Sequence, residues 1–159
     1  MDNLPTFLNG IVRLWNIHQY REDLYKQAMA MDNVGSLRRV CSHGYISSLL
    51  FKKEIQWVYD GIKCSLIDGD ISLKLSQSSL PGRLFSSTDK LSIARILREQ
   101  EQKTIKIYNA ILTGMKLSKD EDDILSDHLQ KLKDIDFQLN KELINSYENY
   151  RPFQMTAAS

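Results

Sequence analysis

Residues 88–114 decide the fold, and they read TDKLSIARILREQEQKTIKIYNAILTG. Residues that are apolar or only weakly polar recur here at steps of three and four, the spacing of one face of an α-helix. That face carries Ala94, Leu97, Glu101, Thr104, Tyr108 and Ile111. Asp89 is a helix start signal, and Gly114 is a stop signal. The stretch predicts an amphipathic helix with a carboxylate midway along its inner face.

Three further stretches show the same periodicity. They extend from about residue 4 to Met31, from Leu37 to Cys64, and from Ser118 to about Tyr150. The last begins with SKDE, in which the serine and the glutamate can each satisfy a backbone N–H of the other residue. Four amphipathic helices predict an all-α fold, a four-helix bundle.

The connection between the second and third helices is unusually long. Residues 65–87 include the turn signals DGD at 68–70 and PG at 81–82. Residues 71–75 alternate like a strand, but a single strand would have no partner, so we expect a short helical turn. More than 20 residues are rarely needed to join neighbouring antiparallel helices, but they are enough to cross the length of a bundle. This favours parallel second and third helices, the ferritin-like order with one crossover, over a simple up-and-down order.

Composition indicates one ordinary globular domain. The chain has 159 residues, and we expect a bundle over 1–150 and a flexible tail over 151–159. With 21 basic and 20 acidic residues, no global field favours nucleic acid or a membrane surface. There is no apolar run of about 20 residues and no signal-peptide pattern at the start. Cys41 and Cys64 fall on one predicted helix, too far apart for a disulfide. We therefore expect a cytoplasmic protein.

Three predicted helices carry an acidic residue near mid-length on the seam expected to face inward. These residues are Glu22, Glu101 and Asp136. Counting at about 1.5 Å per residue places His18 and His43 within roughly two helical turns of them. A buried carboxylate needs hydrogen bonds, a counter-charge or a metal. The five residues form the predicted site.

Two readings of this site remain open. Di-iron and di-manganese bundles use two single glutamates and two Glu-x-x-His pairs, and this chain contains no Glu-x-x-His. The first reading is a metal-free polar layer, satisfied by tyrosine hydroxyls. The second is a degenerate site for iron, manganese or zinc. His18 is either a hydrogen-bonded core residue or a ligand; we expect His43 to form a salt bridge, with Glu22 in reach, and His128 to be a satisfied core or edge residue.

Several short stretches suggest a relative. They are Leu8-Asn9, Tyr20-Arg21-Glu22, Phe51 to Ile55, Glu101 seven residues before Tyr108, and Leu132-Lys133. Over about residues 4 to 145 the chain resembles small bacterial ferritin-like domains of unknown function, which include stress-associated four-helix proteins. The resemblance implies a ferritin-like bundle with a crossover. Such domains often have a histidine in the fourth helix, where this chain has Asp136.

Three functions compete at this point. The first is a non-catalytic, stress-related, ferritin-like bundle that acts by association with itself or with a protein partner. The second is a metal-binding oxidoreductase or metal store that uses Glu22, Glu101, Asp136 and a histidine. The third is a helical adaptor, suggested by Trp57 and Tyr59 on the second predicted helix. We expect no cofactor under the first and third functions.

Overall fold

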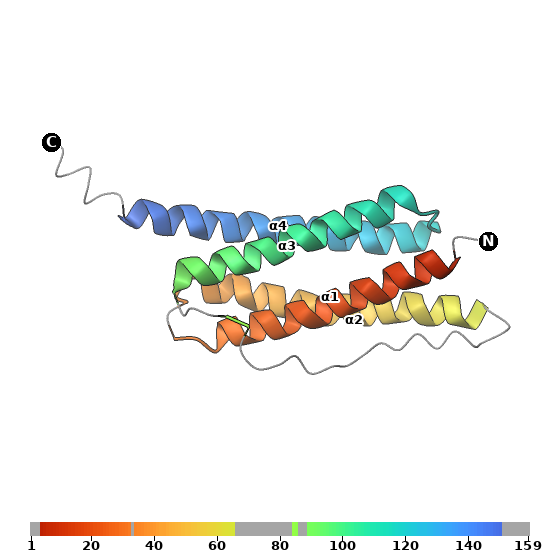
Figure 1. The fold of residues 1–159 in the computed structure, drawn as a ribbon, viewed down its shortest axis with the longest axis horizontal. Coiled ribbons are helices and arrows are strands. Elements are labelled where there is room, and N and C mark those ends of the chain that lie inside the picture. Colours follow the sequence, from red (N-terminus) through yellow and green to blue (C-terminus); the bar gives the residue numbers. More distant parts are fainter. Residues whose placement is uncertain (1–3, 33, 66–83, 86–88, 151–159) are drawn as a thin grey trace.

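The chain folds into four long helices in a computed structural model that describes residues 4–32, 34–65, 84–85 and 89–150. The helices are α1 (Leu4–Met29), α2 (Leu37–Ser65), α3 (Lys90–Gly114) and α4 (Lys119–Tyr150), and the described residues include no strand. Figure 1 shows them lying lengthwise along each other. The predicted all-α four-helix bundle is confirmed, with helix ends within about two residues of their expected positions.

The starts of α3 and α4 follow the predicted capping chemistry. Asp89 caps α3, and its carboxylate accepts a hydrogen bond from the backbone N–H of Ser92 at 3.2 Å. Before α4, the Ser118 hydroxyl accepts from the N–H of Glu121 at 3.2 Å, and the Glu121 carboxylate accepts from the N–H of Ser118 at 2.9 Å. These reciprocal bonds form a capping box, and they satisfy donors that a helix leaves free at its start.

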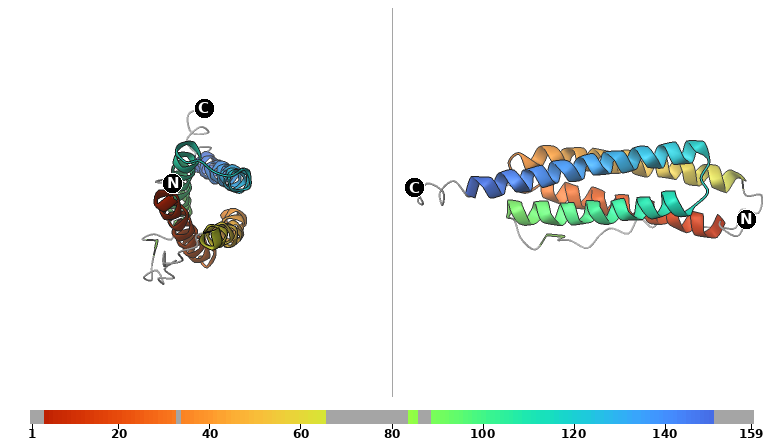
Figure 2. Two further views of the ribbon diagram at one scale, coloured as in Figure 1. Left: turned by 90° about the vertical axis from the view of Figure 1, so that its right-hand side faces the viewer. Right: turned by 90° about the horizontal axis from the view of Figure 1, so that it is seen from above.

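Each helix packs against two neighbours. Contacts join α1 to α2, α2 to α4, α4 to α3 and α3 to α1, and the end-on view shows the same order around the bundle (Figure 2). The diagonal helices α2 and α3 run in the same direction (Figure 1). The end of α2 and the start of α3 therefore lie at opposite ends of the bundle. Residues 66–83, with the expected turn at 71–75, and the expected tail at 151–159 lie outside the described residues.

Two apolar clusters fill the interior on either side of a polar layer. On α1 the fully buried positions recur at steps of three and four, as helix packing requires. They are Ile11, Leu14, His18, Arg21, Leu24, Tyr25 and Ala28. The residues up to Trp15 belong to one cluster, and those from Leu24 onward belong to the other. His18 and Arg21 lie between them, so the polar layer sits at the waist of the bundle.

The small residue Gly44 lets α1 and α2 approach closely beside this layer. The ring of Tyr25 occupies the space that a Cβ at position 44 would need. Because position 44 has no side chain, the Tyr25 ring packs directly against α2 there.

Cys41 is buried as a free thiol on α2, and burial raises its pKa to about 12. The side chain of Cys64 lies outside the described part of the chain. Among the described helices, none combines the length and the apolar character needed to cross a membrane.

Candidate functional site

A buried ion pair between α1 and α3 forms the centre of the candidate site. The Nε–H of Arg21 donates to Glu101 Oε1 at 2.7 Å, and its Nη2 donates to Glu101 Oε2 at 3.1 Å. Both side chains are completely buried. Two parallel hydrogen bonds between a guanidinium and a carboxylate are the strongest geometry for such a pair. Burial is the largest single influence on the pKa of Arg21 and lowers it, but the charge and hydrogen bonding of Glu101, together with the neighbouring tyrosines, raise the pKa overall. Arg21 therefore carries its full positive charge inside the bundle.

Both Nη atoms of Arg21 also make hydrogen bonds outside the ion pair. Nη1 donates to His18 Nδ1 at 3.0 Å, and Nη2 donates to the Ser47 hydroxyl on α2 at 3.0 Å. The guanidinium carbon lies 5.5 Å from the ring centre of Tyr25 and 5.7 Å from that of Phe51, within the range of cation–π attraction. Hydrogen bonds and aromatic faces thus take the place of water around this charge.

From His18 a line of hydrogen bonds crosses the bundle to α2. His18 Nε2 lies 2.6 Å from the hydroxyl of Tyr108 on α3. The same hydroxyl lies 3.0 Å from Nδ1 of His128 on α4. His128 Nε2 lies 3.0 Å from Glu54 Oε1 on α2. We call these residues, from Glu101 through Arg21, His18, Tyr108 and His128 to Glu54, the polar chain.

Arginine fixes the direction of every hydrogen bond in the polar chain. A guanidinium can only donate, so His18 Nδ1 must accept, and the proton of the neutral ring sits on Nε2. Nε2 then donates to the Tyr108 oxygen, and the single hydroxyl proton of Tyr108 is directed to His128 Nδ1. The proton on His128 Nε2 is therefore donated to Glu54. From Arg21 onward, every donor from Nη1 through His18, Tyr108 and His128 points toward the carboxylate of Glu54, which is 33% exposed.

The pKa shifts agree with these tautomers. Burial, followed by the charge of Arg21, lowers the pKa of His18 well below its usual value. Burial also lowers the pKa of His128 to about 4, although Glu54 opposes the change. The pKa of Tyr108 is raised well above 10, mainly by burial. Both imidazoles are therefore neutral at pH 7, and the phenol keeps its proton.

Only two of the five residues in the predicted site belong to the polar chain, namely His18 and Glu101. Glu22 lies beside the α1 seam, half-buried, and pairs with Lys52 at 2.6 Å. Asp136 pairs with Arg98 of α3 at 3.3 Å and is 19% exposed. His43 is exposed on α2. The common interior cluster expected from counting residues along the helices is therefore not formed.

The donor set at the waist does not fit a resident metal ion. Both oxygens of Glu101 bind Arg21, and both ring nitrogens of His18 are engaged by Arg21 and Tyr108. Within the described ranges, no three or more His, Cys, Asp or Glu side chains come together in a way that could hold a metal. The guanidinium supplies the positive charge that Glu101 needs.

Sequence reasoning missed Arg21 and Glu54. The signal for Arg21 was available, because positions 14, 18, 21 and 25 continue the core spacing of α1 without a break. Glu54 gave no such signal, because a half-buried glutamate on the flank of a helix looks like an ordinary surface residue.

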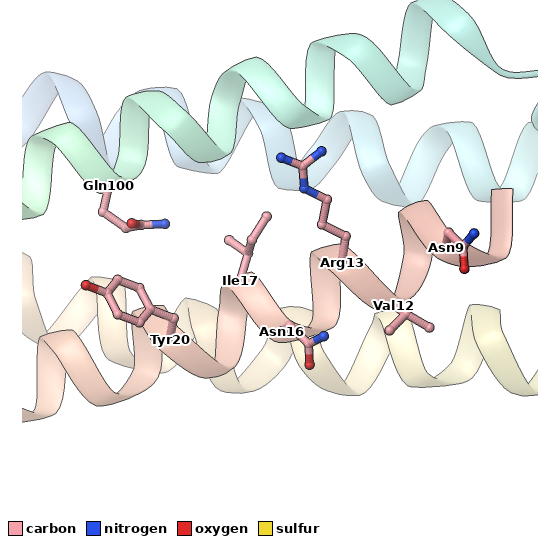
Figure 3. A pocket seen from close by; sticks show the side chains of 7 residues that line it. All are labelled: Asn9, Val12, Arg13, Asn16, Ile17, Tyr20 and Gln100. Carbon is pink, nitrogen blue, oxygen red and sulfur yellow. The ribbon is translucent and has the colours of Figure 1, made fainter. Parts of the chain in front are cut away.

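Two surface hollows flank the waist without reaching the polar chain. One, of about 410 Å³, lies over α1 and α3, where Arg13, Ile17 and Tyr20 of α1 face the same space as Gln100 of α3 (Figure 3). The other, of about 300 Å³, lies between α2 and α4 and is lined partly by Ile46. Ser47, which binds Arg21, lines this second hollow, but no residue of the polar chain lines either one.

No family model, no curated protein and no solved structure matches this chain. The ferritin-like resemblance therefore rests on the sequence stretches quoted for it, and it stays a prediction.

Proposed function

We propose that this chain is a non-catalytic bundle with ferritin-like connectivity, in which an internal arginine takes the place of a metal, and that it acts by protein association. The observation that carries the proposal is the two-bond pairing of Arg21 with Glu101 at the waist, with both side chains fully buried. In carboxylate-bundle proteins, metal ions balance the inward-facing carboxylates of this layer. Here the guanidinium of Arg21, a cation of the chain itself, balances the negative charge of the Glu101 carboxylate.

The absence of an accessible reactive group in the polar chain supports a non-catalytic role. General acid–base catalysis needs a group within hydrogen-bond reach of a bound substrate. His18, Tyr108 and His128 are fully buried and bonded to one another. Of the polar-chain residues, only Glu54 is partly exposed, and its carboxylate is engaged by His128. The polar chain orders the core and offers no group to a substrate.

Exposed apolar side chains support association. On the described surface, large hydrophobic residues stand out on α2 and α4: Ile46, Leu49, Leu50, Trp57, Phe137 and Ile144. Trp57 is 70% exposed and Phe137 is 68% exposed. Single exposed apolar residues are common, but several on adjoining helices are typical of an interaction surface. A cytoplasmic location and a stress-related role remain predictions from composition and from the resemblance.

The metal-binding alternative would need Glu22, Glu101 and Asp136 to share one ion. Each of these carboxylates is paired with a different basic side chain, namely Lys52, Arg21 and Arg98 respectively. No contact in the described structure favours this alternative, so we do not propose it.

Elemental analysis tests the proposal. The protein is purified without chelator, and its iron, manganese and zinc contents are compared with those of Glu101→Ala. We expect less than stoichiometric metal in both proteins, since Arg21 already holds the Glu101 carboxylate. Stoichiometric metal that disappears in Glu101→Ala would overturn the proposal.

Sedimentation velocity tests the association role separately: a strict monomer with no co-purifying partner contradicts it.

A further inference from the structure

The outer face formed by α2 and α4, which we call the α2/α4 face, exposes large apolar side chains around its middle, next to the charged side chains of Lys131 and Asp134. Ile46, Leu50 and Trp57 follow one another along α2 at helical spacing, and Phe137 lies on the neighbouring stretch of α4. The hollow of about 300 Å³ between the two helices runs through this region. Its lining includes Ile46 and Leu50 together with the core residues Phe51 and Ile135.

The two ends of the α2/α4 face carry opposite charges. A hydrogen bond between Ser36 and Glu142 marks one end of the face, and the contact between Glu54 and His128 lies further along it. This register places Arg39 and Lys141 together near the first end. It places Asp60 near the start of α4, at the other end. All three side chains are exposed.

The start of α4 adds to the negative end. Asp120 and Asp122 are exposed in its first turn, and Asp123 is exposed directly after it. Their charges are also favourable there because a helix start carries a partial positive charge. The negative end therefore combines these aspartates with Asp60 of α2.

The opposite charges lie at matching distances from one central level. Arg39 precedes Leu50 by 11 residues, and Asp60 follows it by 10. On α4, Asp120 precedes Lys131 by 11 residues, and Lys141 follows it by 10. The ammonium of Lys131 lies 6.0 Å from the ring centre of Phe51, the residue after Leu50, so the two midpoints share one level. A half-turn about an axis across the helices at this level exchanges the positive end with the negative end.

We infer that the α2/α4 face binds a second copy of this chain, arranged antiparallel about that axis. In this arrangement α2 lies on α2 of the second copy and α4 lies on α4. Arg39 then faces Asp60 of the second copy, and Lys141 faces Asp120. Leu50 meets its own equivalent near the axis, so one patch serves both copies, as a two-fold interface requires. Lys131 also lies opposite its own equivalent there, and Asp127, 3.1 Å from its ammonium, balances its charge within each copy. A parallel pairing would place like charges against each other at both ends.

The size of the α2/α4 face suits a specific dimer. Residues 39–60 of α2 extend about 30 Å at about 1.5 Å per residue. Two adjoining helices, each about 10 Å across, give a face on the order of 600 Å², close to the roughly 800 Å² that each partner contributes to a standard interface. This inference rests on the proposed association role and specifies its partner and surface.

Charge exchange between two variants tests the inference. Arg39→Glu with Lys141→Glu makes both ends of the face negative, and Asp60→Lys with Asp120→Lys makes both ends positive. Because like charges then meet at both ends, we expect each double variant alone to sediment as a monomer at concentrations where the wild-type chain is a dimer. An equimolar mixture restores attraction at both ends, so we expect it to recover the dimer. Lys103→Glu with Lys106→Glu, which changes exposed lysines of α3, is the matched control and leaves the dimer intact.

The outcomes separate this inference from the proposed function. A wild-type dimer that neither double variant disrupts overturns the α2/α4 face but leaves self-association standing. A wild-type monomer overturns the antiparallel dimer, and if no protein co-purifies with it the association role fails as well. Recovery of the dimer only in the mixture supports the antiparallel arrangement.

Cross-linking provides a second readout that does not depend on charge. We expect Leu50→Cys to form an intermolecular disulfide on mild oxidation, because position 50 lies near the axis. Lys103→Cys, on the exposed side of α3, serves as the control, and the wild-type chain gives the background of its native thiols. Equal cross-linking of all three proteins would contradict the placement of the axis.

Discussion

At the scale of single residues, Arg21 explains how a charged layer survives inside this bundle. Removing a guanidinium and a carboxylate from water costs several kcal/mol for each ion, and only close pairing with further hydrogen bonds offsets that cost. Arg21 has both, because it pairs with Glu101 through two bonds and also binds His18 and Ser47. Burial in the same layer, helped at His18 by the charge of Arg21, keeps His18 and His128 neutral, which links stability to pH.

We predict that the folded state weakens as pH falls below about 6.5. His18 and His128 have lowered pKa values in the folded protein, that of His128 being about 4. A histidine in the unfolded chain binds a proton near pH 6.5. Between that pH and the lowered pKa values of the folded protein, the unfolded chain therefore binds protons that the folded chain does not. The free energy of unfolding should fall by up to about 1.4 kcal/mol per pH unit for each histidine, and should be fully recovered above about pH 6.5.

Urea unfolding at several pH values between 7.5 and 4.5 measures this slope. His128→Asn serves as the comparison, since it removes one of the two titrating groups while the carboxylates that titrate in the same range stay in place. We expect a smaller slope for the variant. Equal slopes in both proteins would show that His128 is not held neutral by the fold.

At the scale of helices, spacing predicts burial but not the partner of a buried charge. The inner face of α3 was predicted except for Ile93, with Glu101 on it, because every third or fourth position faces the same direction. On α1 and α4 the same reasoning included Glu22 and Asp136, which flank the seam by one position and reach basic side chains at its edge. Arg21 was overlooked because a lone arginine rarely belongs to a core. Its partner lies 80 positions away, and only the packing of α1 against α3 brings the two together.

The close approach of α1 and α2 leads to a second prediction, for the substitution Gly44→Ala. Alanine is the better helix former by about 1 kcal/mol, so Gly44→Ala would stabilise an unhindered helix. Here the added methyl group overlaps the Tyr25 ring, and overpacking of a core typically costs about 1–3 kcal/mol. We expect a lower free energy of unfolding in urea. Gly61→Ala is the control, since no atom lies within 4 Å of a Cβ built there, and it should be neutral or stabilising. The opposite ranking of the two variants would contradict the close approach.

At the scale of the whole molecule, the polar chain ties all four helices together at the waist. Its residues come from α3, α1, α4 and α2, and it separates the two apolar clusters. Apolar side chains alone would permit the helices to rotate or slide, whereas hydrogen bonds of fixed direction are satisfied in one register. We infer that this layer specifies the arrangement of the bundle and so holds the α2/α4 face in the form needed for association.

A double-mutant cycle on Arg21 and Glu101, measured by urea unfolding at pH 7.5, tests the central claim most directly. The proteins are Arg21→Met, Glu101→Leu and the double variant, with Lys52→Met and Glu22→Leu as a cycle on a pair beside the same layer whose side chains are each 17% exposed. We predict that Glu101→Leu loses about 3–5 kcal/mol, because a buried guanidinium is left without its counter-charge. The double variant should recover at least about 2 kcal/mol of the summed losses, while the Lys52–Glu22 coupling stays below about 1 kcal/mol. If the losses at Arg21 and Glu101 simply add, or if each is below about 1 kcal/mol, the two side chains are not the paired charges on which this account depends.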